Sequence, residues 1–189
     1  MGITLKTLAG WRGVSPYWKL PAAEVQNLAH VEAAAIYRAH YWDAIAGDAL
    51  PAGLDYALFD YGVNSGPAKA VIALQTRLGV AGDGRVGPLT LAACRRADAI
   101  GLIGQLCDDR LAFLKTLSTF LSFGRGWTAR VAEVRAAALV MASEPASSAP
   151  PQPFSPLPRP TPPPTPKPAP AGFWQALIAA ILSILSRKV

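Results

Sequence analysis

Apolar residues recur at three- and four-residue spacing through most of the first 142 residues of the chain. This spacing places apolar side chains on one face of an α-helix, whereas a half-buried strand alternates apolar and polar residues. No alternating run is long enough for a strand, and there is room for at most a short hairpin near the start. We therefore predict an all-α fold, with helices over residues 22–45, 52–64, 68–78, 88–97, 99–120 and 128–141.

Glycine and proline separate several of these helices. Gly66-Pro67 interrupts the apolar pattern, and proline suits a first helical position because its missing N–H is not needed there. Gly79 is predicted to end the following helix, and Pro88 to begin the next one. The sequence GVAGDGRVG between them is a predicted loop, in which we expect Asp83 to accept hydrogen bonds from backbone amides two residues on.

The sequence FGRGW, residues 123–127, is predicted to form another loop, a corner that Trp127 anchors. Arginines follow at five-residue spacing, which spirals around a helix and does not form one stripe. We expect them to belong to a solvated face; they are Arg125, Arg130 and Arg135.

The end of the chain has a different composition. Thirteen of the 18 prolines lie between Pro145 and Pro170. We expect residues 143–170 to be a Pro-rich linker, because such a segment buries too little apolar surface to fold. Residues 171–189 follow as a predicted helix, with an apolar centre at Phe173–Leu185.

This last helix is predicted to associate with a membrane. Aromatic residues at its start and Arg187 and Lys188 at its end suit a bilayer interface. The alternative is a helix that docks on the folded domain. Small residues on one face, Ala176, Ala179 and Ser183, would permit self-association.

The charge distribution and the cysteine and histidine content argue against nucleic-acid binding and against a metal site. Residues 1–144 carry 14 Lys and Arg against 12 Asp and Glu, so the net charge of +6 comes mostly from the tail. No dense basic run with interleaved aromatics occurs, so nucleic acid is not an expected partner. Cys94 and Cys107 are expected to be buried free thiols. His30 and His40 have no third ligand nearby, so we expect no metal site and no cofactor.

Three segments together resemble glycoside hydrolase family 108. They are MGITLKTLAGWRG with AAAIYRAHYWD, then LDYALFDYGVNSGPAKAVIALQTRLGV, then DGRVGPLTLAA with FGRGWTARVAEV. Members of that family are lysozyme-like N-acetylmuramidases, often phage-type endolysins, whose second half is described as a peptidoglycan-binding domain. The resemblance implies a lysozyme-like helical domain, with peptidoglycan glycan strands as its partner. We therefore expect residues 1–48 to be a remnant of the lysozyme-like domain and residues 49–142 to be the peptidoglycan-binding domain.

The resemblance also implies a catalytic acid that we do not find in this chain. In the family, a segment upstream of GIT supplies it, whereas this chain begins at Met1. Met1 is either an internal methionine of a longer protein or the start of a shortened paralogue. A muramidase needs a carboxylic acid whose pKa is raised by an apolar pocket. Glu24 and Glu32 are expected at polar, solvated positions, where carboxylates are poor general acids, so we assign no catalytic residue.

Five residues are candidates for a glycan-binding groove. Asp60 and Asn64, at i and i+4, face the same way, with Tyr61 beside them. Carboxylate and amide groups bond to sugar hydroxyls, and a tyrosine ring stacks on a sugar face. The alternative stays open that Asn64 caps the following turn and Asp60 holds a neighbouring backbone. Trp42 and Asp43, at the end of an earlier helix, complete the set.

Together these features predict a bacterial or phage protein whose helical domain binds peptidoglycan and is tethered to the inner membrane. The family reaction is hydrolysis of the β-1,4 glycosidic bond, which we expect this chain not to perform. We expect no signal peptide, because MGITLKTLAGWRG lacks an apolar run of the required length, and the side of the membrane stays open. The alternative function is a membrane-tethered interaction or scaffold protein with no glycan activity.

Overall fold

The computed structural model describes residues 2–144, and every regular element among them is helical. The all-α prediction is confirmed for this part of the chain, which contains no strand. In chain order the elements are α1 (Leu5–Trp11), η1 (Tyr17–Lys19), α2 (Ala23–Gln26), α3 (His30–Tyr37), η2 (Arg38–Trp42), η3 (Asp43–Ile45), η4 (Gly47–Ala49), α4 (Leu54–Ser65), α5 (Pro67–Leu78), α6 (Pro88–Arg96), α7 (Ala99–Lys115) and α8 (Phe120–Ser143). The element η2 is one turn of π-helix, and the other η elements are 3-10 helices.

The described residues form two compact units, which divide between Tyr37 and Arg38. This division separates two stretches of chain, each of which makes most of its contacts within itself. The predicted boundary between residues 48 and 49 is a functional assignment, and it stays a prediction.

The first unit is small and holds α1, α2 and α3 around its own apolar core. The Thr4 hydroxyl begins α1 by accepting a hydrogen bond from the Thr7 amide at 3.1 Å. The predicted helix through residues 22–45 is wrong in its continuity, because the Asn27 amide closes α2 on the Ala23 carbonyl and Leu28 turns inward. Val31, an apolar residue of α3, is 60% exposed and does not belong to the core. The buried core residues are Ile3, Leu8, Ala9, Leu20, Leu28, Ala33 and Ile36.

The second unit is built on α4 and α5, which are joined as predicted at Gly66-Pro67. Gly66 has φ of 93°, a value that favours glycine, and Pro67 is the first residue of α5. Almost all of α4 is buried, including every residue from Tyr56 to Gly62. Gly79 ends α5 with φ of 67°, and Pro88 begins α6, as expected.

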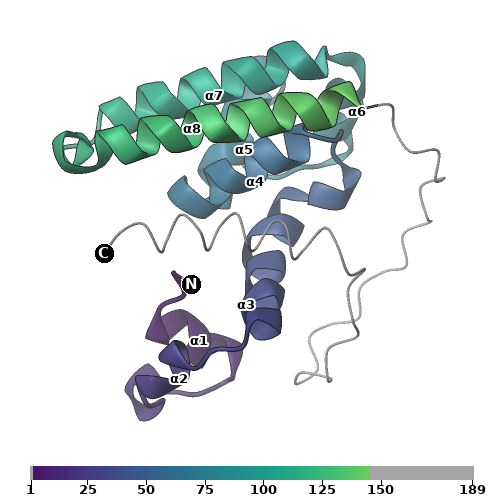
Figure 1. Cartoon of the computed structure of the whole chain (residues 1–189). Coiled ribbons are helices and arrows are strands. Elements are labelled where there is room, and N and C mark those ends of the chain that lie inside the picture. The colour runs from purple at the N-terminus through teal and green to yellow at the C-terminus, as the bar shows by residue number, and fades with distance from the viewer. Residues whose placement is uncertain (1, 145–189) are drawn as a thin grey trace. The chain divides into compact units, whose positions relative to one another are not determined.

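Helices α7 and α8 run side by side in opposite directions along one side of the second unit (Figure 1). The predicted loop at residues 123–127 is wrong, because α8 passes through it and the turn lies earlier, between Lys115 and Phe120. The Thr116 hydroxyl stabilises that turn by donating to the Phe113 carbonyl at 2.7 Å. Gly124 lies inside α8 with the Phe120 ring against it, only 2.7 Å from where a Cβ would be, so this position suits a residue without a side chain.

Gln75 is a buried amide that joins α5, the following loop and α6. Its Nε2 donates to Asp83 Oδ1 at 2.7 Å, to the Arg85 carbonyl at 2.9 Å and to Thr90 Oγ1 at 3.2 Å. Its Oε1 accepts from the Gly84 amide at 3.0 Å. Asp83 also accepts from the Arg85 amide at 2.9 Å, which confirms its predicted place in shaping the loop. A single side chain therefore fixes the position of α6 relative to α5.

Cys94 and Cys107 are free and buried, as expected, and burial raises the pKa of both thiols. Among residues 2–144, no helix is both long and apolar enough to cross a bilayer. The predicted Pro-rich linker and the predicted membrane helix with its centre at Phe173–Leu185 lie outside the described residues.

Replacing Gln75 with leucine removes all four hydrogen bonds and leaves the buried Thr90 hydroxyl without this partner. We expect the free energy of unfolding to fall by about 2–3 kcal/mol. Thr76→Ala is the matched control, because Thr76 is exposed and bonds only to its own helix; we expect a change within about 0.5 kcal/mol. Urea unfolding of the full chain measures both, and equal stabilities would show that the amide does not hold the loop.

Candidate functional site

The five predicted glycan-binding residues divide by exposure. Asn64 and Asp43 are exposed, whereas Trp42, Asp60 and Tyr61 are buried. The apolar pattern of α4 continues through its polar residues, so Asp60 and Tyr61 lie on the packed side of the helix. Asn64 lies one turn later, near the C-terminal end of α4.

Asp60 is the centre of a buried ion-pair cluster. Its Oδ1 accepts from Arg110 Nη1 of α7, and its Oδ2 accepts from Arg130 of α8, with Nε at 2.9 Å. The side chains of Asp60 and Arg110 are 9% and 5% exposed, so both charges are nearly removed from water. Among the described residues, Arg110 Nε has no hydrogen-bond partner. The cluster therefore ties α4 to α7 and α8.

Trp42 is a buried core side chain. Its ring meets Phe59 edge-on at a centroid distance of 5.7 Å, and its Nε1 donates to Asp48 Oδ1 at 2.8 Å. Gly47 lies under the ring, where an added Cβ would be 2.4 Å from Trp42 Cε2. Packing this close leaves Trp42 no free face for stacking on a sugar.

The exposed candidates keep polar atoms at the surface. Asp43 pairs with Arg38 at 3.4 Å, and Arg38 also pairs with Asp48. Asn64 Oδ1 accepts from the Ser65 hydroxyl at 3.1 Å, and its amide is open to solvent. Asn64 is thus the candidate whose donors and acceptors are best placed to meet a ligand.

In the first unit, Arg12 joins the two glutamates considered for catalysis. Arg12 Nη1 donates to Glu24 Oε2 at 2.9 Å, while Nε and Nη2 bind both oxygens of Glu32 at 2.8 and 2.7 Å. This bidentate contact lowers the pKa of Glu32. The prediction that Glu32 is solvated is wrong, because its side chain is half-buried. Its ion pair with Arg12 nevertheless makes it a poor proton donor, as a solvated carboxylate would be.

Asp55, in the first turn of α4, is a carboxyl that the sequence analysis missed. Burial raises its pKa to about 6, although its Oδ1 accepts a hydrogen bond from the Tyr56 amide at 2.6 Å. A pKa near 6 suits a general acid at near-neutral pH. The available sequence signal was an acid directly beside the apolar run of α4.

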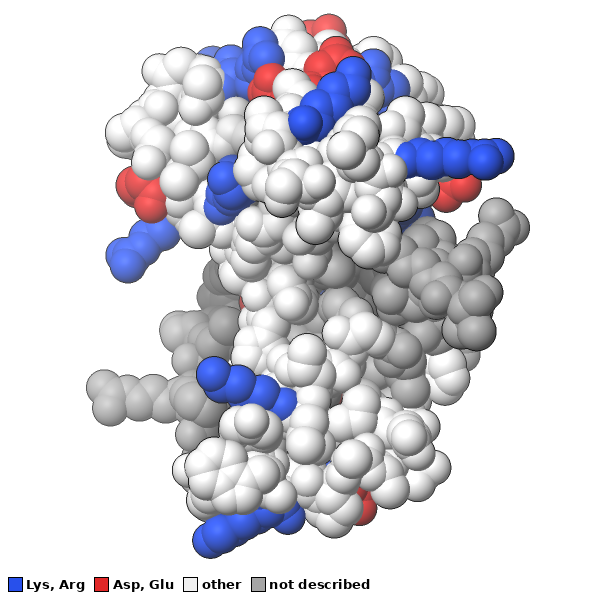
Figure 2. All heavy atoms as spheres, turned by 90° about the vertical axis from the view of Figure 1, so that its left-hand side faces the viewer, with Lys and Arg blue, Asp and Glu red and all other residues white. Residues whose placement is uncertain are grey.

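Two arginines at the surface of α5 and α8 are paired with acids on α7. Arg77 binds Asp109 with Nε to Oδ2 at 2.7 Å, and Arg135 binds Asp108. On the face drawn in Figure 2, basic side chains are spread singly and several lie against acidic ones. Arg130 departs from its predicted solvated face, because it turns inward to Asp60. In the part of the chain that the structure describes, no group of three His, Cys, Asp or Glu is placed to hold a metal.

Comparison with known proteins places these residues in a family. The family model for glycosyl hydrolase 108 matches residues 1–66. Among solved structures, SagA of Brucella abortus is 50% identical; the match covers 77% of this chain and 81% of that chain, with a TM-score of 0.70. The chain belongs to the glycosyl hydrolase 108 family. No curated protein matches it.

Membership of glycosyl hydrolase 108 confirms the resemblance and supports a peptidoglycan-directed, lysozyme-like function. The matched residues 1–66 include the first unit and reach the end of α4. They contain all five predicted glycan-binding residues, whose role stays a prediction. Helices α5 to α8 lie beyond this match.

Replacing Asp60 with alanine leaves the buried Arg110 and the half-buried Arg130 without their counter-charge. We expect the free energy of unfolding to fall by about 3–5 kcal/mol. The matched control is Asn64→Ala, one turn later on the same helix and exposed, for which we expect a change within about 0.5 kcal/mol. Urea unfolding compares them, and an Asp60→Ala protein within about 1 kcal/mol of wild type would contradict a structural role for the cluster.

The raised pKa of Asp55 predicts that the folded protein becomes less stable as the pH rises. Its pKa is about 6 when folded and about 3.9 when unfolded, so the folded chain binds more protons in between and loses stability as pH rises from about 4 to 7. Asp55→Asn keeps an oxygen for the Tyr56 amide and removes this loss. We expect its stability relative to wild type to increase by about 1–2 kcal/mol over that range, allowing for partial solvent access.

Urea unfolding at several pH values measures this change. Glu133→Gln is the control for the loss of a surface carboxylate, because Glu133 is an exposed acid on α8. A difference between Asp55→Asn and wild type that does not change with pH would show that the Asp55 carboxyl is ordinary.

Proposed function

We propose that this protein binds the glycan strands of peptidoglycan and does not hydrolyse their β-1,4 bonds. Membership of glycosyl hydrolase 108 supports the substrate class. The observation that carries the binding-only part is the pairing of Glu24 and Glu32 with Arg12. A glycosidase acid must be protonated when substrate binds, and an arginine partner favours the ionised form instead.

The proposed glycan contacts come from exposed polar groups of the second unit. Asn64 presents a carboxamide, which donates to and accepts from sugar hydroxyls and N-acetyl groups. Asp43 adds an exposed carboxylate. We assign a supporting role, without direct glycan contact, to the buried residues Asp60, Tyr61 and Trp42, because their packing keeps α4 and the η2–η3 segment in place.

Asp55 favours a second candidate function, hydrolysis with Asp55 as the proton donor. It is half-buried, and its pKa of about 6 leaves part of the population protonated near neutral pH. Hydrolysis also needs a second carboxylate opposite the acid. Asp48 lies close enough to raise the Asp55 pKa further, but its oxygens already accept from Trp42 and Arg38. We therefore rank this function second.

Binding is tested by sedimentation of the full chain with insoluble peptidoglycan. We expect wild type to co-sediment and Asn64→Ala to bind about two- to fivefold more weakly, the effect of about one lost hydrogen bond. Asn27→Ala, an exposed asparagine of the first unit, is the matched control and should bind like wild type. Capture of membrane proteins with no cell-wall sedimentation would favour the scaffold alternative.

Hydrolysis is tested on the same cell walls by turbidity. We expect no clearing at rates comparable to an active lysozyme. Clearing that Asp55→Asn abolishes would replace the binding-only proposal with the second candidate.

A further inference from the structure

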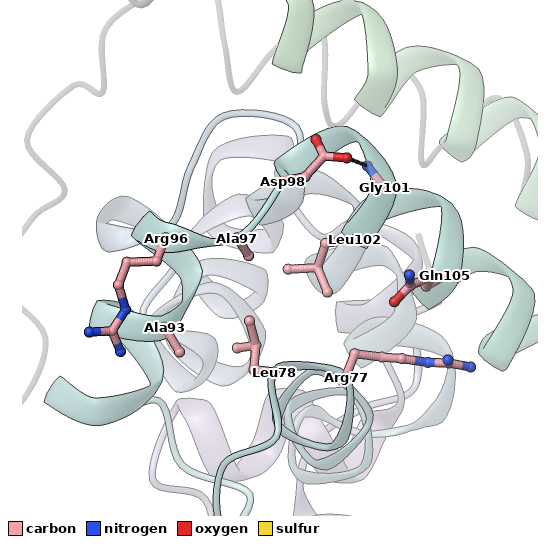
Figure 3. A pocket seen from close by; sticks show the side chains of 9 residues that line it. All are labelled: Arg77, Leu78, Ala93, Arg96, Ala97, Asp98, Gly101, Leu102 and Gln105. Atoms are coloured by element: carbon pink, nitrogen blue, oxygen red, sulfur yellow. Dashed lines mark hydrogen bonds between the residues drawn. The ribbon is translucent and has the colours of Figure 1, made fainter.

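A pocket of about 390 Å³ opens between α5, α6 and α7. Its central surface is apolar and formed by small or aliphatic side chains, namely Leu78, Ala93, Ala97 and Leu102 (Figure 3). The volume is within the range of small-ligand sites. No aromatic ring lines it, so it lacks the stacking surface that a sugar ring would use.

Two arginines line the pocket, and Arg96 is the one whose guanidinium is available to a ligand. Figure 3 shows Arg96 and Arg77 on opposite sides of the pocket. Arg77 is already paired with Asp109. The Asp98 carboxylate accepts from the amides of Ile100 and Gly101, both at 3.1 Å, so its charge caps α7. Arg96 is exposed, and no described acid pairs with it.

The pocket is also a built feature of the fold. The Gln75 hydrogen bonds hold α6 against α5, and so fix the distance between the walls that carry Arg96 and Leu78. Gln105 of α7 adds a carboxamide at the edge. A pre-formed site with a small apolar surface and one available guanidinium fits a short alanine-containing chain that ends in a carboxylate.

We propose that this pocket binds the stem peptide of peptidoglycan, with the methyl group of a terminal D-alanine on Leu78 and Leu102 and its carboxylate on Arg96. The inference rests on the proposed function, because peptidoglycan supplies both glycan and peptide. It adds a second contact outside residues 1–66, on the part of the chain that the family model does not match.

The test titrates the full chain with a synthetic stem tetrapeptide, acetyl-L-alanyl-D-isoglutamyl-diaminopimelyl-D-alanine, by NMR or calorimetry. We expect Arg96→Gln to weaken binding about tenfold, the usual size of one charge-assisted contact. Arg95→Gln is the matched control, because Arg95 is the adjacent exposed arginine and does not line the pocket; it should change affinity less than twofold. Amidation of the terminal D-alanine should weaken binding to wild type about tenfold and to Arg96→Gln hardly at all.

Three results would overturn the inference. They are no saturable peptide binding, equal effects of the two arginine variants, and competition by inorganic phosphate as effective as by the peptide, which would indicate a general anion site. Sedimentation with whole peptidoglycan separates this inference from the proposed function. Co-sedimentation without peptide binding contradicts only the pocket, whereas loss of both contradicts both.

Discussion

A charged carboxylate on the packed face of α4 has to be neutralised, and this requirement organises the second unit. Asp60 is nearly removed from water, and guanidinium groups from α7 and α8 neutralise it. An unpaired charge in the interior costs several kcal/mol, so α4 packs favourably only where both arginines reach it. One carboxylate thus sets the relative positions of helices that are 50 and 70 residues apart in the sequence. Because α5 follows α4 directly through Gly66, the pocket walls depend on the same ion pairs.

Acidic residues in this chain act mainly as partners of arginine, and this use opposes catalysis. Arg12 binds Glu24 and Glu32 much as Arg110 and Arg130 bind Asp60, and the pairing lowers the pKa of Glu32. A general acid needs an apolar environment without a cation. Asp55 is closer to that condition, because burial outweighs the amides that bond to it. The contrast between Glu32 and Asp55 is therefore one of environment and not of residue type.

The sequence predicts those features that depend on neighbouring residues. Gly66-Pro67, Gly79 and Pro88 bound their helices as expected, since φ preferences and a missing N–H act locally. The loop predicted at Gly124 and Gly126 is wrong, because these glycines lie inside α8 and the close approach of the Phe120 ring, which leaves no room for a Cβ at Gly124, is not visible in the local pattern. The same limit applies to the site. Asp60 was selected as a polar residue on an apolar face, but its partners Arg110 and Arg130 lie far along the chain. Asn64 needs no distant partner and lies exposed near the end of α4, while its place in a glycan groove stays a prediction.

Asn64, Asp43 and the pocket at Arg96 all belong to the unit of residues 38–144. Each offers only a few solvent-exposed polar contacts, and such contacts contribute little individually. Peptidoglycan is a repeating polymer in which every stem peptide is covalently attached to the glycan. In the binding mode proposed above, a glycan strand on α4 would hold its stem peptide at high effective concentration near the pocket, so that two weak contacts would add to one stronger attachment. The Asp60 cluster and Gln75 belong to one packed core, so little conformational entropy would be lost when the second proposed contact forms. The proposed binding to the intact wall would thus draw its affinity from the spacing of the two contacts, and such binding requires no catalytic carboxylate.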